Sequence, residues 1–577
     1  MRIIATAGHV DHGKSTLIRR LTGINPDRWI EEQERGLTID LGFAHMQLPT
    51  GENIAFIDVP GHTKFIGNML AGVGGINACI LVVDGHEGWK PQTEEHLRIM
   101  QLVGVTHGII ALTKIDLCDA DDRELAMMDI ADHVAETFLQ DAPILQLSAT
   151  TGEGLNDFIS ALDALAITSN PSINHQRPRL FIDRVFAAKG SGTVVTGTLT
   201  DGSFAIGDNV LITPSGCEAK IRGIQTLGQA VEMIEPGHRV ALNLSGIDHS
   251  EIIRGNVVIH ENNWHLSDRV DASLQVLGSL KHVVSRRGAF TVHVGSDEIP
   301  TRVRVLGPES IAPGHEGLVR LHLSRAVPLL PGDRYVLRES GRSETVGGGE
   351  ILDVAPKLPA SRARPSRSVD RVVNEHSWIT ASSLSLLTGE KREAQFGEWI
   401  VDPDVLATTI AAIESQITKS GDTGIDLLEF NERERLVVAT LPQVSIVHGR
   451  VTLVGVHDPL LDHPIIEQLK SDGCAPRSPL GITPPELRRL AKAGLLFERE
   501  GEWFHVSALE TARTIASQLL HNNPEGFTMS QFREALGVTR KHAVPLAGEL
   551  DARAMTRRRG DVRIAGPKIK ISLVQTL

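Results

Sequence analysis

One stretch near the start of the chain constrains its fold more than any other feature. Residues 8–16 read Gly-His-Val-Asp-His-Gly-Lys-Ser-Thr and fit the phosphate-loop pattern of Gly, four residues and Gly-Lys-Ser. The apolar residues 2–7 predict a buried strand before the loop, and residues 15–21 predict a helix after it. Backbone N–H groups and a helix N-terminus in that order form a nest for phosphates. The stretch therefore predicts a site for a nucleoside triphosphate.

Two side chains of this loop have predictable roles. Lys14 would reach the β- and γ-phosphates, and Ser15 would bind Mg²⁺. The nucleotide contacts predicted from the loop are Gly8, His9, Val10, Asp11, His12, Gly13, Lys14, Ser15 and Thr16.

Apolar runs alternate with helix-like stretches over residues 1–170. The runs are residues 3–7, 54–59, 78–83, 108–112 and 144–147. This rhythm predicts an α/β domain with a doubly wound parallel sheet. Ligands of such sheets bind outside the carboxyl ends of the strands. The polar motifs that follow these runs should therefore converge on one crevice.

The run at 54–59 ends in Asp-Val-Pro-Gly-His. Asp58 could hold Mg²⁺ through water, and Gly61 leaves its backbone N–H able to approach a γ-phosphate. We interpret His62 as the catalytic residue that positions the attacking water, as a glutamine does in other P-loop GTPases. The alternatives are a simple Pro-Gly turn and an exposed loop histidine.

Residues 35–40, Arg-Gly-Leu-Thr-Ile-Asp, lie between the loop and that run. Thr38 could complete the Mg²⁺ shell while a γ-phosphate is bound. The segment would then be ordered by the triphosphate and released on hydrolysis. On its own, a Thr-Ile pair is equally compatible with the start of a strand.

Two later motifs select the base. Thr113-Lys114-Ile115-Asp116 follows the run at 108–112, and Ser148-Ala149 follows the run at 144–147. The Asp116 carboxylate can accept from guanine N1 and N2, which adenine cannot match. The Lys114 stem can cover the base, and Ser148-Ala149 can donate a backbone N–H to guanine O6. The predicted nucleotides are therefore GTP and GDP, with Mg²⁺.

These motifs, in this order, resemble those of the translational GTPases of the elongation factor Tu kind. The resemblance implies that Val10 and Leu37 form an apolar gate beside His62, which the ribosome opens. One residue departs from the pattern, because Thr113 stands where most GTPases have Asn. Asn normally ties the base loop to the phosphate loop, so the departure affects the expected strength of nucleotide binding.

Short β-runs punctuated by glycine follow a linker that begins at Asn170-Pro171. Their spacing predicts a β-barrel over residues 177–262 and a second one over 264–356. Residues 189–197, Lys-Gly-Ser-Gly-Thr-Val-Val-Thr-Gly, resemble the second-domain signature of the same GTPases. A GTPase domain followed by two barrels is the architecture that carries aminoacyl-tRNA.

Two arginines, Arg184 and Arg239, lie on predicted strands of the first barrel, with Asp183 beside them. The resemblance implies that this part of the family's architecture binds the amino acid of the carried tRNA. A selenol is more acidic than a thiol, so two guanidiniums could hold selenocysteine as an anion. Asp183 could orient Arg184 or simply pair with it. The alternative is that both arginines are surface strand residues.

The rest of the chain predicts a linker and an α+β array. Residues 357–368 contain two prolines, four basic residues and no acid, which predicts an exposed linker, with a solvated tether favoured over a basic segment that touches RNA. Residues 369–577 alternate helical stretches with short β-pairs, in units near 369–403, 404–457, 458–506 and 507–567. Helix, turn, helix and β-hairpin follow one another in the last unit, which predicts a winged helix.

The last unit is basic in an acidic chain. Residues 521–577 contain ten Lys or Arg and five Asp or Glu, against a net charge of −13 for the whole chain. The charge gathers at a helix N-terminus and at the predicted wing, where winged helices meet nucleic acid. A solvated face is the alternative. The predicted mRNA contacts are Arg540, Lys541, Arg557, Arg558, Arg559 and Arg563.

Winged helices appended to such a GTPase resemble the bacterial selenocysteine-specific elongation factors over essentially the whole chain. The resemblance implies delivery of selenocysteyl-tRNA to the ribosome at UGA codons, with ribosome-stimulated GTP hydrolysis. It also implies that the last winged helix binds the selenocysteine insertion hairpin in mRNA. The alternatives are a generic aminoacyl-tRNA or initiation-type GTPase, and an RNA-binding regulator in which the GTPase is only a switch.

Composition adds expectations about location and assembly. No apolar run reaches the ~18 residues of a membrane span. The four cysteines lie far apart and suit a reducing compartment. The first strand leads straight into the phosphate loop, which predicts no signal peptide, and no dimerisation seam is visible. We expect a cytoplasmic monomer without a membrane partner.

Overall fold

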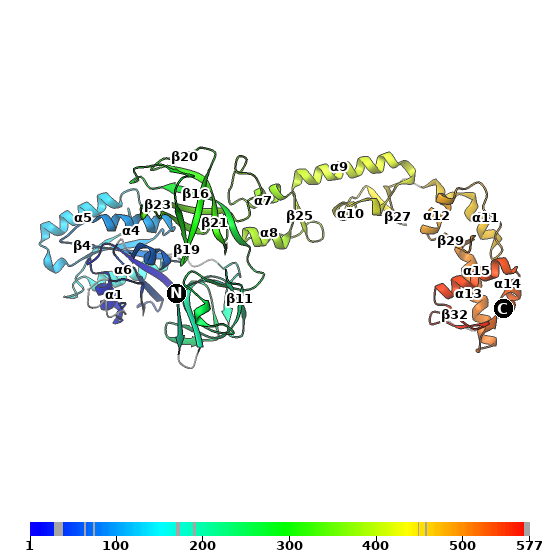
Figure 1. The fold of residues 1–577 in the computed structure, drawn as a ribbon, viewed down its shortest axis with the longest axis horizontal. Coiled ribbons are helices and arrows are strands. Elements are labelled where there is room, and N and C mark those ends of the chain that lie inside the picture. The colour runs from blue at the N-terminus through cyan, green and yellow to red at the C-terminus, as the bar shows by residue number, and fades with distance from the viewer. Residues whose placement is uncertain are drawn as a thin grey trace. The chain divides into compact units, whose positions relative to one another are not determined.

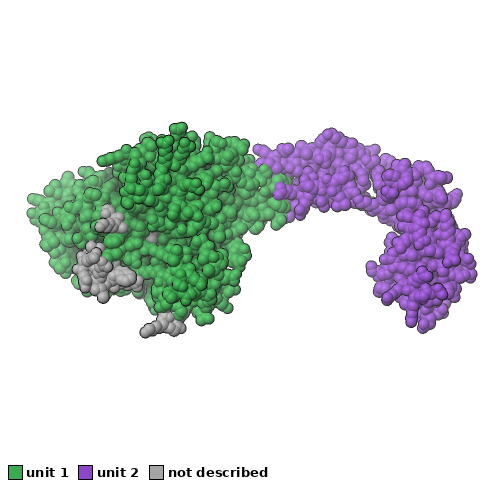
Figure 2. All heavy atoms as spheres, in the orientation of Figure 1, with its two compact units in different colours: residues 1–394, 398–400 green, residues 395–397, 401–577 purple. Residues whose placement is uncertain are grey.

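The computed structural model describes residues 1–27, 38–62, 65–72, 75–168, 174–188, 192–447, 449–455 and 458–569. These residues form two compact units (Figure 2). Unit 1 is residues 1–394 with 398–400, and unit 2 is residues 395–397 with 401–577. None of the helices in the described ranges has both the length and the apolarity needed to cross a bilayer.

The first domain of unit 1 is a six-stranded sheet in the order β2-β3-β1-β4-β5-β6. Among these described strands, β2 is antiparallel to its neighbour and the others run parallel. Buried apolar clusters cover both faces of the sheet, as expected of a doubly wound fold. The strands are β1 (Arg2–Ala7), β2 (Gly42–Gln47), β3 (Asn53–Asp58), β4 (Ala78–Asp84), β5 (Gly108–Thr113) and β6 (Ile144–Gln146).

Helices of the described ranges accompany this sheet, and each strand predicted from an apolar run is present (Figure 1). The helix α5 begins at Asp119, whose side chain accepts from the Asp122 N–H and satisfies an otherwise unpaired donor. The helices are α1 (Lys14–Thr22), α3 (Ile66–Gly72), α4 (Pro91–Leu102), α5 (Ala120–Val134) and α6 (Leu155–Thr168).

Barrel II follows the GTPase domain. Its sheet closes because β10 pairs with both β15 and β11. Side chains such as Ile182, Val195 and Leu242 fill the interior. The strands are β7 (Arg179–Ala188), β8 (Gly192–Asp201), β9 (Phe204–Ala205), β10 (Asn209–Thr213), β11 (Cys217–Thr226), β12 (Gln229–Val231), β13 (Met233–Ile234), β14 (His238–Ser245) and β15 (Val257–Ile259).

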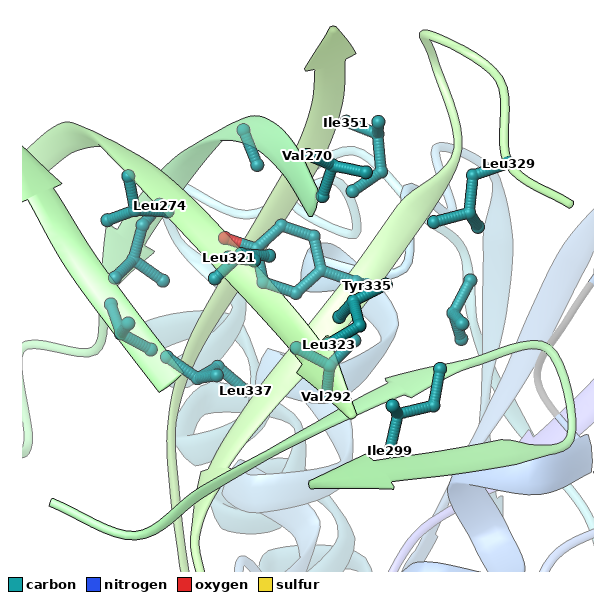
Figure 3. Packing of buried hydrophobic residues seen from close by; sticks show 14 of the residues in the cluster. Val270, Leu274, Val292, Ile299, Leu321, Leu323, Leu329, Tyr335, Leu337 and Ile351 are labelled. Carbon is teal, nitrogen blue, oxygen red and sulfur yellow. The ribbon is translucent and has the colours of Figure 1, made fainter. Parts of the chain in front are cut away.

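Barrel III is a closed barrel in the order β16-β21-β19-β18-β22-β23. Figure 3 shows Leu321, Leu323 and Tyr335 pointing into its interior. The Tyr335 hydroxyl donates to the Ser273 carbonyl oxygen over 2.7 Å, so its one polar atom is satisfied. The strands are β16 (Leu266–Val276), β17 (Val284–Ser285), β18 (Phe290–Val294), β19 (Asp297–Leu306), β20 (Ser310–Ile311), β21 (Glu316–Pro328), β22 (Arg334–Glu339) and β23 (Glu344–Asp353).

The segment 357–368 is exposed at its four basic residues, as its composition predicted, but it is not a free tether. Ala360 and Ala363 are buried and pack against Leu306 and Leu318 of barrel III. The burial of these alanines was missed because the prediction rested on charge and proline content. Ala360 and Ala363 lie three residues apart, and this spacing lets both alanines pack on the barrel.

The first predicted unit of the C-terminal array belongs to unit 1. It contains α7 (Val369–His376), β24 (Trp378–Thr380), α8 (Ala381–Thr388) and β25 (Trp399–Val401). Arg371 on α7 forms an ion pair with Asp353 at 2.8 Å. Arg177, at the start of barrel II, donates to the Ser385 hydroxyl over 2.8 Å. The unit boundary therefore lies near residues 395–401 rather than at the linker.

The described residues of unit 2 form three further winged helices, each of helices followed by a β-hairpin. Polar caps start the helices: Asp402 accepts from the N–H groups of Asp404 and Val405. The first has α9 (Pro403–Ser420), β26 (Ile425–Asp426), α10 (Glu432–Val438), β27 (Val444–Val447) and β28 (Arg450–Leu453). The second has α11 (Pro464–Asp472), α12 (Pro484–Lys492), β29 (Leu496–Arg499) and β30 (Glu502–His505). The last has α13 (Val506–Asn522), β31 (Phe527–Thr528), α14 (Met529–Leu536), α15 (Arg540–Ala552), β32 (Thr556–Arg559) and β33 (Val562–Ala565).

Candidate functional site

The phosphate loop runs from the end of β1 into α1, as its pattern predicted. Gly8 has φ +135°, and a Cβ there would fall on the Val82 carbonyl oxygen. Gly13 has φ +91° directly before α1. Both positions need glycine, because other residues rarely adopt such φ values.

Lys14 is buried beneath this loop. Its Nζ donates to the carbonyl oxygens of Gly8 over 3.1 Å and His9 over 2.6 Å. Burial lowers the Lys14 pKa to about 8, against the opposing charge of Asp58. The ammonium group is thus held at the loop, where a phosphate would be its natural counter-charge.

Ser15 lies within hydrogen-bonding distance of the other two predicted metal ligands, Asp58 and Thr38. Ser15 Oγ donates to Asp58 Oδ2 over 2.6 Å and lies 2.9 Å from Thr38 Oγ1. Thr38 Oγ1 also donates to Asp27 Oδ1 over 2.9 Å. Burial raises the pKa of Asp58, while the Ser15 hydrogen bond opposes that rise. Asp27 belongs to no motif, so no sequence signal pointed to it.

Oxygen ligands of this kind suit Mg²⁺, which usually takes one or two carboxylates plus substrate phosphates. No group of three or more His, Cys, Asp or Glu that could hold a metal exists in the described part of the chain. The hydroxyls of Ser15 and Thr38 with Asp58 fit a Mg²⁺ that is shared with a nucleotide.

The segment after β3 lies directly against the phosphate loop. A Cβ on Gly61 would come within 2.7 Å of both Lys14 Nζ and the Val10 backbone nitrogen. The His62 ring lies 5.8 Å from the Phe65 ring, centroid to centroid. Leu37, the other predicted gate residue, is outside the described residues, so the gate with Val10 stays a prediction.

The base loop is tied to the phosphate loop in spite of the Thr113 departure. The Thr113 hydroxyl donates to the His12 carbonyl oxygen over 2.7 Å and also lies 3.2 Å from the Val83 carbonyl oxygen. Lys114 Nζ forms an ion pair with Asp84 at 2.8 Å. The Thr113 hydroxyl thus connects the base loop to the phosphate loop, as is expected of Asn. It has a single proton, which the His12 and Val83 carbonyl oxygens share.

Asp116 and Ser148, which are predicted to contact guanine, differ from each other in their surroundings. Asp116 is exposed in the short helix η2 (Ile115–Leu117). The Ser148 N–H donates to the Glu153 carbonyl oxygen over 3.0 Å. The N–H of Ala149 is therefore the better candidate to reach guanine O6.

Two buried histidines brace the phosphate loop. His96 Nδ1, on α4, accepts from the Gly8 N–H over 3.1 Å, and His12 Nδ1 accepts from the Asp84 N–H over 3.2 Å. Burial lowers the pKa of His96 to about 3 and that of His12 to about 4. Both rings are therefore neutral near pH 7 and act as acceptors. His96 lies 88 residues from Gly8, and no sequence motif pointed to it.

Asp183, Arg184 and Arg239 gather at the contact between barrel II and the GTPase domain. Asp183 accepts from Arg239 over 2.5 and 2.8 Å. The guanidinium carbons of Arg239 and Arg184 lie 3.3 and 4.6 Å from the centre of the Phe43 ring. Arg184 also donates to the Leu41 carbonyl oxygen. Phe43, on β2, was missed because its role depends on contact between domains.

A pocket of about 210 Å³ adjoins this cluster and is lined partly by Phe43, Thr196 and Arg239. The Thr196 hydroxyl donates to Asp183 over 2.8 Å, so Asp183 has two partners on barrel II strands. Arg239 is thereby fixed at the pocket wall.

The predicted mRNA contacts fall into two groups. Arg540 and the three consecutive arginines Arg557, Arg558 and Arg559 are exposed. The other two are ion-paired: Lys541 with Glu502 at 2.8 Å, and Arg563 with Asp551 at 2.9 Å. Charge available to an outside partner is therefore concentrated on the first strand of the wing.

Comparisons with known proteins agree with this architecture. Residues 1–168 match the model of the elongation factor Tu GTP binding domain. Residues 267–358 match the selenocysteine-specific elongation factor β-barrel domain, and residues 518–565 match the elongation factor SelB winged helix. A Selenocysteine-specific elongation factor from Methanocaldococcus jannaschii is 32% identical over 414 residues, which cover 67% of this chain and 86% of the relative. The chain belongs to the selenocysteine-specific elongation factors.

Two further comparisons extend the likeness within this family. A crystal structure of bacterial selenocysteine-specific elongation factor EF-Sec is similar with a TM-score of 0.72 and 27% identity, over 98% of this chain and all of that one. A relative from Desulfomicrobium baculatum is 39% identical over 391 residues, or 67% of this chain. The chain spans only 60% of that relative's length. As a member of the selenocysteine-specific elongation factors, the protein has a GTP binding domain of the elongation factor Tu kind at residues 1–168.

Proposed function

We propose that the protein delivers selenocysteyl-tRNA to the ribosome at UGA codons in a GTP-dependent step. We also propose that its last winged helix binds the selenocysteine insertion hairpin in mRNA. One observation carries the first proposal: Asp183, Arg184 and Arg239 meet Phe43 of the GTPase domain, five residues beyond Thr38. One short segment of the chain therefore contains both Phe43, which contacts the proposed selenocysteine pocket, and Thr38, a predicted Mg²⁺ ligand.

The nucleotide would be held by the phosphate loop, with Lys14 on the β- and γ-phosphates. Ser15, Thr38 and Asp58 would hold Mg²⁺, Asp58 through water. When bound, Mg²⁺ neutralises charge that develops on the phosphates. Asp116 and the Ala149 N–H would select guanine. Thr113 supports this arrangement by holding His12 and hence the phosphate loop.

Hydrolysis would depend on the segment after β3. Gly61 lies next to Lys14, so its N–H would contact the γ-phosphate that Lys14 is proposed to hold. His62, the next residue, would orient the attacking water toward phosphorus. Thr38 and Gly61 would both be released when the γ-phosphate leaves, which ends the tRNA-competent state.

Selenocysteine would bind at the arginine pair. A guanidinium has five N–H donors, and Asp183 and Thr196 account for three contacts of Arg239. Asp183 already balances the charge of Arg239, and the remaining Arg239 N–H donors suit a selenolate, which accepts hydrogen bonds more strongly than the neutral serine hydroxyl at the same pH. Stacking on Phe43 fixes the plane of both guanidiniums.

The exposed arginines at 540 and 557–559 support hairpin binding, since arginine forms charge-assisted hydrogen bonds with phosphate oxygens. A generic aminoacyl-tRNA or initiation-type GTPase would share the nucleotide motifs but has no use for this basic wing. A regulator in which the GTPase is only a switch gives no role to Asp183 and the two arginines. The same assignment implies a cytoplasmic monomer.

Filter binding of charged tRNAs to the full chain with a non-hydrolysable GTP analogue tests the proposal. We expect selenocysteyl-tRNA to bind far more tightly than seryl-tRNA on the same tRNA body. Arg239→Lys should keep GTP binding but lose most of this preference, because lysine lacks the planar fork. A preference for seryl-tRNA or for standard aminoacyl-tRNAs would refute the assignment.

A further inference from the structure

The wing of the second winged helix in unit 2, formed by β29 and β30, packs against the last winged helix. One buried cluster contains side chains from this wing and from α15: Phe497, Phe504, Ala543, Leu546 and Leu550. Both elements belong to the same compact unit. Because packed cores are rigid, the shared cluster holds the wing in a fixed position beside α15. Charged side chains on the β29–β30 wing can therefore act on the last winged helix.

Glu502, at the start of β30, lies at the N-terminus of α15. The first turn of α15 contains Arg540, Lys541 and His542 and no acidic residue. Glu502 Oε1 lies 2.8 Å from Lys541 Nζ, and Glu502 Oε2 lies 4.0 Å from His542 Nε2. The carboxylate of one winged helix is thus paired with a basic side chain at the start of a helix in the next.

The charge that Glu502 balances at neutral pH belongs to Lys541. Burial lowers the pKa of His542, although the negative charge of Glu502 opposes this change. The His542 ring also packs edge-on against the Phe504 ring, with 6.5 Å between the ring centroids. The imidazole therefore acts as a neutral packing group, and the pair of Glu502 and Lys541 has no net charge.

The Glu502 carboxylate is shielded from water, whereas its partner is exposed. The Glu502 side chain is 16% exposed and the Lys541 side chain is 61% exposed. Lys541 can leave the pair by rotating into solvent, but the packed wing keeps Glu502 in place. An ion pair with an exposed partner contributes little to the stability of a fold. Stability alone therefore gives little reason for an acidic residue at this position.

The position of Glu502 affects RNA binding because a helix N-terminus attracts phosphate groups. Arg540 and Lys541 add positive charge there, so RNA of any sequence could bind at this point through its phosphates. Glu502 adds a negative charge at the same point and neutralises Lys541. The three arginines of the last wing, residues 557–559, are exposed. Phosphate binding is thus weakened at the start of α15 and retained on the last wing.

We propose that Glu502 is a specificity-determining residue, which makes the last winged helix reject RNAs other than the selenocysteine insertion hairpin. This inference rests on the proposed hairpin binding. An unrelated RNA binds through phosphates in many orientations, and Glu502 disfavours those that place a phosphate at the start of α15. The hairpin binds in one orientation, on the last wing, and loses less affinity. Specificity is a difference of affinities, so it increases when the wrong partner meets a repulsive group.

The test is gel-shift titration of the full chain with a selenocysteine insertion hairpin and with an unrelated RNA hairpin of the same length. The Glu502→Gln variant should bind the unrelated hairpin about fivefold more tightly, because Lys541 is then free to bind a phosphate. The slope of log K against log salt for this RNA should become steeper by about one. The insertion hairpin should gain at most about twofold, so the preference for it should fall.

The matched control is Glu467→Gln. Glu467 pairs with Lys470 at 3.1 Å on α11 of the same winged helix, so this variant loses the same charge beside the same type of partner. It should leave the affinity for the unrelated hairpin and the salt slope unchanged. The double variant Glu502→Gln/Lys541→Gln should lose the gain that Glu502→Gln produces, because the freed ammonium group is absent.

A second variant tests the same pair without changing the packed wing. Lys541→Gln alters an exposed side chain and leaves Glu502 unbalanced, so it should weaken binding of the unrelated hairpin; unchanged binding would overturn the inference. A folded Glu502→Gln variant with wild-type affinity and slope for the unrelated hairpin would overturn it too. So would equal gains for both RNAs, because Glu502 would then not discriminate between them. A wild-type chain without any preference for the insertion hairpin would instead refute the proposed hairpin binding.

Discussion

Replacing Thr113 by valine should weaken nucleotide binding, because the Thr113 hydroxyl ties the base loop to the phosphate loop. Thr113 Oγ1 donates to the His12 carbonyl oxygen over 2.7 Å. Thr113 is 3% exposed and His12 is fully buried, so water cannot easily replace the missing donor. Valine has nearly the same shape as threonine and leaves the surrounding packing in place.

The expected size follows from the buried carbonyl group that is left without a donor. Such a group costs about 1–3 kcal/mol. Part of this cost would appear as lower stability of the nucleotide-free protein, which leaves about 1–2 kcal/mol in the binding equilibrium. Since 1.4 kcal/mol is a factor of ten, GTP and GDP should bind about 5–30 times more weakly. Most of the change should appear in the dissociation rate.

Stopped-flow fluorescence with labelled GDP and GTP measures both rate constants directly. Thr113→Ser keeps the hydroxyl, so its affinity should stay within about twofold of wild type. If Thr113→Val is folded and releases nucleotide at the wild-type rate, the hydroxyl does not hold the two loops together and the reasoning fails.

Three other predictions use different measurements. His62→Ala should keep GTP affinity but lower ribosome-stimulated hydrolysis by ~10²–10⁴-fold, the usual size for a residue that directs proton transfer; unchanged single-turnover rates would remove His62 from the mechanism. Deletion of residues 507–577 should abolish hairpin binding in gel-shift assays and spare GTP binding; retained hairpin affinity would place the RNA site elsewhere. The pKa of His96 is about 3 in the folded protein and near 6.5 in the unfolded chain. Between pH 3 and pH 6.5, only the unfolded chain therefore binds this proton. Acid consequently destabilises the fold. From pH 7 to pH 5, the unfolding free energy of wild type should therefore fall by about 2 kcal/mol more than that of the His96→Gln variant, as measured by urea titration. Equal decreases in the two proteins would contradict the low pKa of His96.

The nucleotide motifs could be predicted from the sequence because each follows a strand of one parallel sheet. Chain order and strand type are enough to bring Ser15 and Asp58 to the same sheet edge, and they lie 2.6 Å apart. Asp27 and His96 contact the same site from positions that no pattern marks. Their contacts depend on how the helix α4 and the loop after α1 pack, which periodicity does not specify.

The linker illustrates a different limit. Its prolines and charges predicted a tether, yet Ala360 and Ala363 are buried. An alanine contributes little to any hydropathy pattern, and its burial is decided by the shape of the surface that it meets. The strands of barrel III place Leu306 and Leu318 side by side under the linker. The two alanines are buried because they pack against these leucines.

Phe43 connects the two ends of the proposed mechanism. Thr38 contacts Ser15 through its hydroxyl, the Leu41 carbonyl oxygen accepts from Arg184, and Phe43 lies against both guanidiniums. Five residues of extended chain span at most ~18 Å, so we expect ordering at Thr38 to affect the shape of the arginine cluster. By linkage, any factor by which GTP tightens cargo binding must equal the factor by which the cargo tightens GTP binding. Selenocysteyl-tRNA should therefore slow GTP release, and replacing Phe43 by leucine should reduce both effects together.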